Sequence, residues 1–479
     1  MSYIRRVNSN TSLSDRILTA LARHCIFPLQ EVAKGHRSLG VLNQMRQDEH
    51  LPIAELKERQ SARLRNLLVH SLETVPYYRE RFSAYGITLQ GMPNPECLKE
   101  LPFLTKEDIR TNLEAMKSST AKKVTQFATG GSTGSPLIFY LGPSRISSDI
   151  AARARAEGWW GLGIGDPEFV LWGSPIEVGK QDRLRAVRDK VMRTELFSAF
   201  EMTETMMDSY VERLCSGRYR RVFGYPSSIA LLSARATETG KDLASAGVRA
   251  VFVTGESLIV EWRSLISETF GCPVANGYGG RDSGFIAHEC PSGGMHTTAD
   301  RIIVEIVDEE GKSVPAGTPG EIVVTHLDTF EMPMIRYRTG DVGALSTKVC
   351  SCGRTLPLME RIDGRQTDFI LTPDGRTMHG LSVIYILREV EGIKQFRIIQ
   401  KELDQIDVEV VPGPSYSKEC EPRIREGFCK RLRAQVTVNI RYIDQIPSTK
   451  SGKFRYVISE IGTGRGRATV PESSDAVKL

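Results

Sequence analysis

A glycine-rich loop, FATGGSTGSPLIFY at residues 127–140, joins two apolar runs and contains residue types that bind phosphate. Glycines permit positive φ and expose successive backbone N–H groups, which form a concave ring of donors for phosphate oxygens. Ser132 and Thr133 would add hydroxyl donors. The ordinary phosphate-binding loop has lysine after its last glycine, whereas Ser-Pro follows Gly134 here. From these residues alone, the segment is either an anion-binding loop or a tight turn between strands.

Two further stretches contain side chains that bind metals. HECPSGGMH, residues 288–296, has a cysteine and a histidine separated by five residues, and CSCGR, residues 350–354, has two cysteines separated by one. Three thiolates and an imidazole suit a closed, structural Zn²⁺ site without an open position for chemistry. His288 competes as a ligand, and incidental buried cysteines are the alternative. The candidate ligands are Cys290, His296, Cys350 and Cys352.

Composition excludes several classes of protein. The chain has 479 residues, is 40% hydrophobic and 25% charged, and carries a formal charge of +5, which is typical of a globular protein without a nucleic-acid surface. No apolar run is long enough to span a bilayer, and the N-terminal arginines precede no signal-peptide core, so we expect a cytoplasmic protein without integral membrane contact. Nine cysteines, an odd number, favour reduced thiols over a disulfide framework.

The elements that position these residues follow from hydrophobic periodicity. Residues 54–82 place leucines at helical spacing up to a proline, which predicts an α-helical entry segment. From about residue 120, short β-rich runs such as EFVLWG and VRAVFVTGE alternate with helical stretches, which indicates an α/β domain with a mixed or parallel sheet. Residues 301–345 join strands through Gly/Pro turns and predict an antiparallel subdomain. A smaller α+β domain should follow residue 365.

Four motifs follow the loop in a fixed order: NGYGGRDSG at 276–284, YRTGD at 337–341, RIDGR at 361–365 and PSTKSGK at 447–453. With the loop, this series resembles the adenylate-forming ligases, the superfamily of acyl-CoA synthetases, peptide-synthetase adenylation domains and luciferases. The stretches VPYYRERF, LPFLTKEDIR, FGYPSS and EMPMIRYRTGD are similar to the phenylacetate–CoA ligase branch, particularly its capsule- and exopolysaccharide-associated relatives. The resemblance covers about residues 55–460.

The resemblance implies an α/β fold in which a large N-terminal domain with a β-subdomain precedes a small, mobile C-terminal α+β domain. Residues 1–50 would form a helical extension, 51–363 the large ATP- and acyl-binding domain, and 364–461 the small lid domain. Residues 462–479 are polar and glycine-rich, and we expect them to be disordered.

The resemblance also implies ATP as a substrate and assigns roles in binding it. Tyr278 would stack on adenine, and Asn276 would lie near the adenine amino group. Asp341 would accept hydrogen bonds from both ribose hydroxyls, with Arg365 close by. The loop residues expected around the β- and γ-phosphates are Thr129, Gly130, Gly131, Ser132, Thr133 and Gly134.

Catalysis in the family uses a lysine on the small domain, and the matching residue here is Lys453. This lysine would approach the carboxylate and α-phosphate as pyrophosphate leaves. The small domain would then rotate about a hinge at Thr367 or Asp368 between adenylation and thioester formation. Thr367 replaces the commoner hinge aspartate, which weakens this expectation. Asp282 replaces the commoner Mg²⁺-binding glutamate and is one methylene shorter, so water could mediate its contact with the metal.

The resemblance places the acyl pocket near Tyr225, Ser227 and Gly277, although packing in the core explains the first two residues equally well. Glu256 ends a strand where α/β folds bind ligands, and helix capping is its alternative role. Some relatives carry a similar cysteine–histidine set, which favours Zn²⁺ over incidental cysteines at the candidate metal ligands.

The sequence therefore predicts an ATP- and Mg²⁺-dependent acid–thiol ligase that makes an acyl-adenylate from a carboxylic acid and transfers the acyl group to coenzyme A or a carrier thiol. One alternative transfers the acyl group to an amine, or AMP to an acidic hydroxyl. Another is a nucleotide-binding protein without ligase activity, and a third is an interaction module organised by zinc. Acid identity and oligomeric state stay open, with a homodimer as one alternative.

Overall fold

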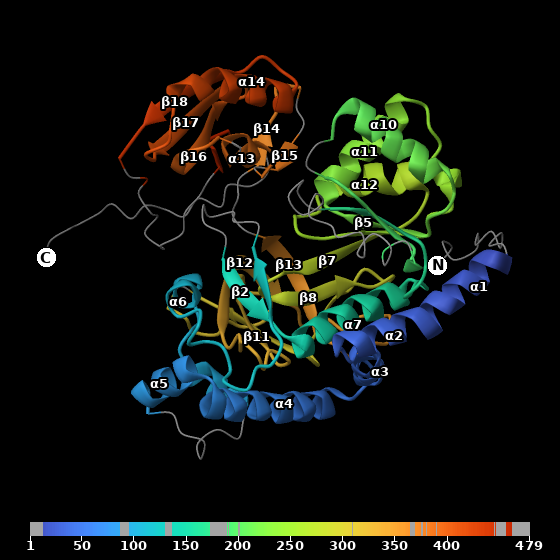
Figure 1. Cartoon of the computed structure of the whole chain (residues 1–479), viewed down its shortest axis with the longest axis vertical. Helices are drawn as coiled ribbons and strands as arrows, with labels where there is room; N and C mark the ends of the chain where they lie inside the picture. The colour runs from blue at the N-terminus through green and yellow to red at the C-terminus, as the bar shows by residue number, and fades with distance from the viewer. Residues whose placement is uncertain are drawn as a thin grey trace, which may run out of the picture. The chain divides into compact units, whose positions relative to one another are not determined.

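The structure is a computed structural model, and its described residues form two compact units divided in the sequence after Arg365. Each unit is considered by itself below (Figure 1). The described residues are 13–86, 95–129, 137–172, 189, 191–199, 202–308, 310–364, 369–374, 377–379, 381–388, 390–444, 446 and 457–461.

The first unit begins with helices. They are α1 (Leu13–Leu21), η1 (Ala22–Ile26), α2 (Phe27–Lys34), α3 (Ser38–Asp48), α4 (Ile53–Thr74), α5 (Pro76–Ala84), η3 (Pro95–Glu100) and α6 (Lys106–Thr111). The predicted helical entry segment is confirmed: α4 buries Leu64, Leu67 and Leu68 along one face and ends before Pro76, which occupies the first turn of α5. None of the described helices combines the length and apolar character that crossing a bilayer requires.

An 11-stranded sheet with the order β10-β11-β12-β13-β9-β8-β7-β6-β5-β3-β4 forms the frame of this unit. In the order of the sheet, every pair between β4 and β7 is parallel, and every pair between β7 and β10 is antiparallel. The bounds are β3 (Glu168–Leu171), β4 (Thr194–Phe197), β5 (Arg221–Gly224), β6 (Ala250–Val253), β7 (Val274–Gly280), β8 (Gly284–Glu289), β9 (Met295–Thr297), β10 (Ile302–Val307), β11 (Gly320–His326), β12 (Tyr337–Leu345) and β13 (Leu358–Gly364). The α/β domain and its antiparallel subdomain were both predicted correctly.

Helices cover both faces of the parallel strands, as buried parallel strands require. In Figure 1, α10, α11 and α12 lie on one side of β5, and α7 lies on the other. Neighbouring side chains point to opposite faces, because Val222 packs with the first group of helices, whereas Phe223 joins a separate core cluster with Phe252. The helices are α7 (Pro143–Trp159), α10 (Glu204–Cys215), α11 (Pro226–Glu238), η4 (Ala244–Ala246) and α12 (Val260–Phe270).

The second unit has its own sheet and core, in agreement with the predicted α+β domain. The antiparallel pair β14 (Phe369–Leu371) and β15 (Thr377–His379) precedes a four-stranded sheet of order β18-β17-β16-β19. Buried Ile398, Val408 and Phe428 belong to one apolar cluster. The remaining elements are α13 (Leu381–Arg388), β16 (Ile393–Glu402), β17 (Gln405–Pro412), η5 (Lys418–Cys420), α14 (Glu421–Leu432), β18 (Thr437–Tyr442) and β19 (Val457–Ser459).

A buried arginine joins the antiparallel subdomain to the entry segment. Arg336 has positive φ (50°), and its guanidinium forms two hydrogen bonds of 2.9 and 3.1 Å with Glu305. It also donates to the carbonyls of Lys99 and Leu101 and lies 4.0 Å from the centre of the Phe103 ring. The charge is therefore paired, hydrogen-bonded and stacked, which offsets the cost of burying it.

We predict that Arg336→Ala lowers the free energy of unfolding by about 3–5 kcal/mol, because it leaves Glu305 buried without its cation. Lys348→Ala is the matched control, since Lys348 forms an ion pair with Glu360 while 77% of its side chain is exposed. Urea unfolding of both variants would measure the difference. Equal stability losses in the two variants would contradict the prediction.

Candidate functional site

The motif NGYGG forms the carboxyl end of the last parallel strand, β7. Strands β5 and β6 end beside β7, and ligands of open α/β sheets bind at such ends. On its other edge, β7 pairs antiparallel with β8, so β7 joins the parallel part of the sheet to the antiparallel part. The site is thus placed where the direction of the strands reverses.

Two predicted nucleotide-binding residues are in direct contact. The Tyr278 hydroxyl on β7 donates a hydrogen bond of 2.9 Å to Oδ2 of Asp341 on β12. The Asp341 backbone N–H donates to the Thr339 hydroxyl, which fixes the turn in YRTGD. Motifs separated by about 60 residues in the sequence therefore meet, as the predicted roles in binding one nucleoside require.

Asn276 combines a fixed backbone with a buried side-chain acceptor. Its backbone N–H donates to a Glu289 carboxylate oxygen at 2.9 Å, and this carboxylate also pairs with Arg263. The side-chain Oδ1 is buried and has no hydrogen-bond partner among the described residues. A buried acceptor without a partner is costly, so Asn276 suits a ligand that brings an N–H or O–H donor.

Asp282 occupies the turn between β7 and β8 and exposes 5% of its surface. Its Oδ2 accepts a 2.6 Å hydrogen bond from the Tyr337 hydroxyl, and its Oδ1 accepts from the Ser283 backbone N–H at 3.1 Å. Both carboxylate oxygens are therefore held by the protein, and each keeps a second lone pair. No sequence motif predicted that the tyrosine of YRTGD would orient the aspartate of YGGRD.

A buried arginine–aspartate pair beneath this turn was also not predicted from the sequence. Arg145 on α7 is fully buried and pairs with Asp149 at 2.9 Å, while its other nitrogens approach the carbonyls of Arg281 and Asp282. Burial alone would raise the pKa of Asp149, but Arg145 and His326 outweigh burial and lower it. The spacing of Arg145 and Asp149, one helical turn apart, was the available signal; their burial depends on tertiary packing.

The glycine-rich loop has a defined base. Strands β1 (Thr125–Ala128) and β2 (Ile138–Leu141) form an antiparallel pair. Thr129 and Leu137 continue it: the Thr129 N–H donates to the Leu137 carbonyl, and the Leu137 N–H donates to the Thr129 hydroxyl, both at 3.0 Å. The hydroxyl of Thr129 therefore already accepts one hydrogen bond.

Several predicted residues lie outside the described part of the chain, together with the predicted disordered tail at 462–479. They are Gly130, Gly131, Ser132, Thr133, Gly134, Arg365, Thr367, Asp368 and Lys453.

The three predicted acyl-pocket residues have different surroundings. Tyr225 stacks on Trp172 with ring centroids 4.0 Å apart. The Ser227 N–H, in the first turn of α11, donates to Glu256, so Glu256 has the capping role given as its alternative. Gly277 lines a pocket at the ends of β5, β6 and β7, but Tyr225 and Ser227 do not line that pocket.

The predicted metal ligands come together. Cys290 follows β8, His296 lies on β9, and Cys350 and Cys352 lie between β12 and β13. One ligand atom from each residue lies within 4.8 Å of those of the other three. The Sγ atoms of Cys290 and Cys350 are 3.5 Å apart, and His296 Nε2 is 3.2 Å from Cys352 Sγ.

This donor set fits a tetrahedral metal ion. Zn–S and Zn–N bond lengths imply edges of about 3.8 Å between sulfurs and about 3.5 Å between sulfur and nitrogen. The Nδ1 atom of His296 lies 3.1 Å from the Leu356 carbonyl, so it can donate there and leave Nε2 for the metal. Burial raises the pKa of Cys290 to about 12, and binding a cation would favour its thiolate.

Comparison with known proteins agrees with these motifs. A family described as the CapK C-terminal domain matches residues 370–460. Protein CapK of Staphylococcus aureus is 24% identical over 368 residues, which cover 76% of this chain and 80% of CapK. The chain is similar to CapK and to phenylacetate–coenzyme A ligases. One such ligase, from Thermus thermophilus, is 23% identical over 454 residues, covering 86% of this chain and 98% of the ligase.

Solved structures show the same fold. 2-Hydroxyisobutyryl-CoA ligase in complex with 2-HIB-AMP and CoA matches with a TM-score of 0.64 and 22% identity, covering 86% of this chain and 91% of that structure. The same ligase in its postadenylation state gives a TM-score of 0.59. The chain therefore has the fold of adenylate-forming CoA ligases, and the predicted fold class and resemblance are confirmed.

Close approach of β7 and β8 requires a glycine at residue 279. A Cβ there would lie 2.1 Å from the Gly284 carbonyl oxygen and 3.0 Å from the Phe285 Cα. We predict that Gly279→Ala separates the strands and lowers the free energy of unfolding by about 1–3 kcal/mol.

Gly40→Ala is the control, because a Cβ at this position in α3 meets no atom within 4 Å. It should stabilise the helix by about 0.5–1 kcal/mol. Urea unfolding of both variants checks the pair, and unchanged stability of Gly279→Ala would refute the prediction.

Proposed function

We propose that this protein is an ATP-dependent carboxylate ligase that forms an acyl-adenylate, releases pyrophosphate and transfers the acyl group to coenzyme A. The observation that carries the proposal is the hydrogen bond from Tyr278 to Asp341, which links the two nucleotide-binding motifs at the carboxyl end of the parallel strands. Several of the similar proteins are phenylacetate–coenzyme A ligases, and this supports the same class of reaction.

In the proposed nucleotide site, the ring of Tyr278 stacks on adenine and its hydroxyl holds Asp341. The Asp341 carboxylate accepts hydrogen bonds from the ribose hydroxyls, and Arg365 lies near the same sugar. The buried Oδ1 of Asn276 supports a contact with the adenine amino group, because that group supplies the missing donor. Backbone N–H groups and hydroxyls of residues 129–134 hold the β- and γ-phosphates.

Mg²⁺ bound with ATP would neutralise charge on the phosphate oxygens. Asp282 supplies a hard oxygen ligand of the kind that Mg²⁺ prefers. Tyr337 and Ser283 orient its two oxygens, and each oxygen keeps a lone pair with which Asp282 would hold the ion, directly or through water. Arg145 contributes by fixing the backbone of the turn that carries this aspartate.

The reaction then needs two displacements. A carboxylate oxygen of the acid attacks the α-phosphorus, and the bond to pyrophosphate breaks with its electron pair leaving on pyrophosphate. In this proposal Lys453 would approach the reacting oxygens, where an ammonium group stabilises the developing charge. In the second step, the thiolate of coenzyme A attacks the acyl carbon and AMP leaves, after rotation of the small domain about Thr367 or Asp368.

We predict that pyrophosphate release from MgATP requires a specific acid, and that Lys453→Ala slows it by about 10²–10³-fold. The measurement compares aryl, fatty and hydroxylated acids with and without coenzyme A. Lys348→Ala is the matched control, because it also removes a lysine ammonium but from an exposed ion pair. This control should retain full activity.

Each other outcome would indicate a different function for this protein. Pyrophosphate release that coenzyme A does not convert to thioester would favour transfer to an amine or of AMP to a hydroxyl. Binding of ATP without turnover of any acid would replace the ligase with a nucleotide-binding protein. Equal rates for Lys453→Ala and wild type would refute the role of Lys453.

We also propose that Cys290, His296, Cys350 and Cys352 bind a structural Zn²⁺. The approach of their ligand atoms to within 4.8 Å supports this assignment, as does the hydrogen bond available to the second nitrogen of His296. Four protein ligands leave no open position, so the ion would stabilise the fold without touching substrate. It would join the end of β8 to the segment between β12 and β13.

We predict stoichiometric zinc in the purified protein by elemental analysis, and its loss in Cys352→Ser, with a melting temperature lower by several degrees. Cys215→Ser is the control, because Cys215 is an exposed free thiol. It should retain the metal and the wild-type melting temperature. Wild-type protein without zinc, even after refolding with ZnCl₂ and reductant, would refute the site.

A further inference from the structure

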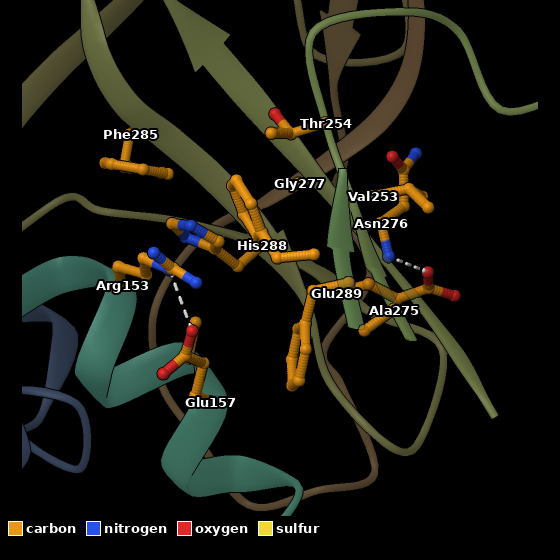
Figure 2. Close-up of a pocket in the computed structure, with 13 residues that line it drawn as sticks. Arg153, Glu157, Val253, Thr254, Ala275, Asn276, Gly277, Phe285, His288 and Glu289 are labelled. Carbon is orange, nitrogen blue, oxygen red and sulfur yellow. Dashed lines mark hydrogen bonds and ion pairs between the residues drawn. The ribbon is translucent and has the colours of Figure 1, made fainter. Parts of the chain in front are cut away.

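A pocket lies where helix α7 covers the ends of the parallel strands (Figure 2). Phe223, Phe252 and Ala275 line it from β5, β6 and β7, and Phe285 lines it from β8. Gly277 contributes a wall without a side chain. These apolar groups form its walls, as in pockets that bind the hydrocarbon part of a ligand.

The charged groups of the pocket are already paired. Arg153 forms ion pairs with Glu157 (2.8 Å) and Glu168, and Arg221 pairs with the same two carboxylates. The Arg153 guanidinium also lies 4.0 Å from the centre of the Phe223 ring. Two cations and two anions therefore neutralise one another, and this group offers no net charge to an ionic substituent of a ligand.

His288 is different from these groups. It exposes 9% of its surface and stacks on Phe285 with ring centroids 5.3 Å apart. Its Nε2 is buried and has no hydrogen-bond partner among the described residues. Figure 2 shows the ring beside Phe285 and Arg153, within the pocket that α7 covers. A ring nitrogen so placed favours a ligand that brings its own hydrogen-bonding group.

We propose that the pocket selects a carboxylic acid whose hydrocarbon part carries a hydroxyl group that hydrogen-bonds to Nε2 of His288. This inference rests on the proposed ligase function and specifies its substrate class. A hydroxyl suits the position because it both donates and accepts, and so matches either tautomer of the imidazole. The paired charges around Arg153 favour a neutral substituent over an ammonium or a second carboxylate.

Discrimination follows from the cost of leaving Nε2 without a partner. An acid that lacks the hydroxyl fills the apolar walls equally well but leaves the buried nitrogen unpaired. Sites that hydrogen-bond a substrate hydroxyl therefore reject the analogue without it. We expect kcat/KM for the hydroxylated acid to exceed that for its deoxy partner by about 10–100-fold.

The test uses pyrophosphate release with pairs of acids that differ by one hydroxyl: phenylacetate against its ortho, meta and para hydroxy derivatives, and butyrate against its hydroxy derivatives. Each pair is measured with wild type, His288→Phe and His288→Gln. Phenylalanine keeps an aromatic ring beside Phe285 and removes the polar atom, whereas glutamine keeps a donor and an acceptor. Phe252→Leu is the control for changes in pocket shape, because it alters an apolar wall alone.

The inference predicts that wild type prefers one hydroxylated acid, that His288→Phe reduces this preference to near unity, and that His288→Gln restores part of it. Phe252→Leu should change both acids of a pair by a similar factor. Thermal unfolding and zinc content of each variant separate loss of folding or of metal from a change in selectivity, since His288 lies two residues from Cys290.

Turnover of acids with equal kcat/KM within every pair would overturn this inference and leave the ligase function intact. A hydroxyl preference that His288→Phe retains would also overturn it. Lack of pyrophosphate release with every acid would refute the proposed function, and the inference with it.

Discussion

Strand β7 pairs in parallel with β6 along one edge and antiparallel with β8 along the other. The sheet changes direction at this strand, so the carboxyl ends of the parallel strands meet a hairpin that turns back beside them. Asn276, Gly277 and Tyr278 occupy that end, and Asp282 occupies the turn that follows. Adjacent side chains of a strand face opposite sides of the sheet. Strand β7 can therefore contribute both nucleotide-binding candidates and residues that line the pocket.

Helix α7 is held to this sheet by buried charges as well as by apolar packing. Arg145 fixes the turn at Asp282, Arg153 belongs to the neutral group beside the pocket, and Arg155 pairs with Asp300 at 2.9 Å. Buried ion pairs are costly to form but still more costly to break, so loss of one partner would destabilise this placement of the helix. The helix thereby sets the distance between the pocket wall and the turn that carries Asp282.

The sequence was sufficient for local features and for motifs with a fixed spacing. It identified the helices of the entry segment, the alternation of strands and helices, and the members of the cysteine–histidine cluster, because each depends on periodicity or on family motifs. It could not identify the bond from Tyr337 to Asp282 or the burial of His288. Those features arise where distant segments pack together, and no sequence pattern predicts which residues meet there. The phosphate loop, Lys453 and the hinge stay predictions, since they lie outside the described residues.

The cysteine cluster also has a consequence for the redox chemistry of the chain. The Sγ atoms of Cys290 and Cys350 are 3.5 Å apart, and a disulfide bond needs about 2.0 Å, so a small displacement would bring them to bonding distance. Metal bound to the thiolates would protect them from oxidants, whereas removal of the metal in air would expose them to disulfide formation. Oxidation would consume two ligands at once and leave His296 and Cys352 with too few partners to hold an ion. Loss of metal under oxidising conditions would then be reversed by a reductant together with added metal, but not by added metal alone.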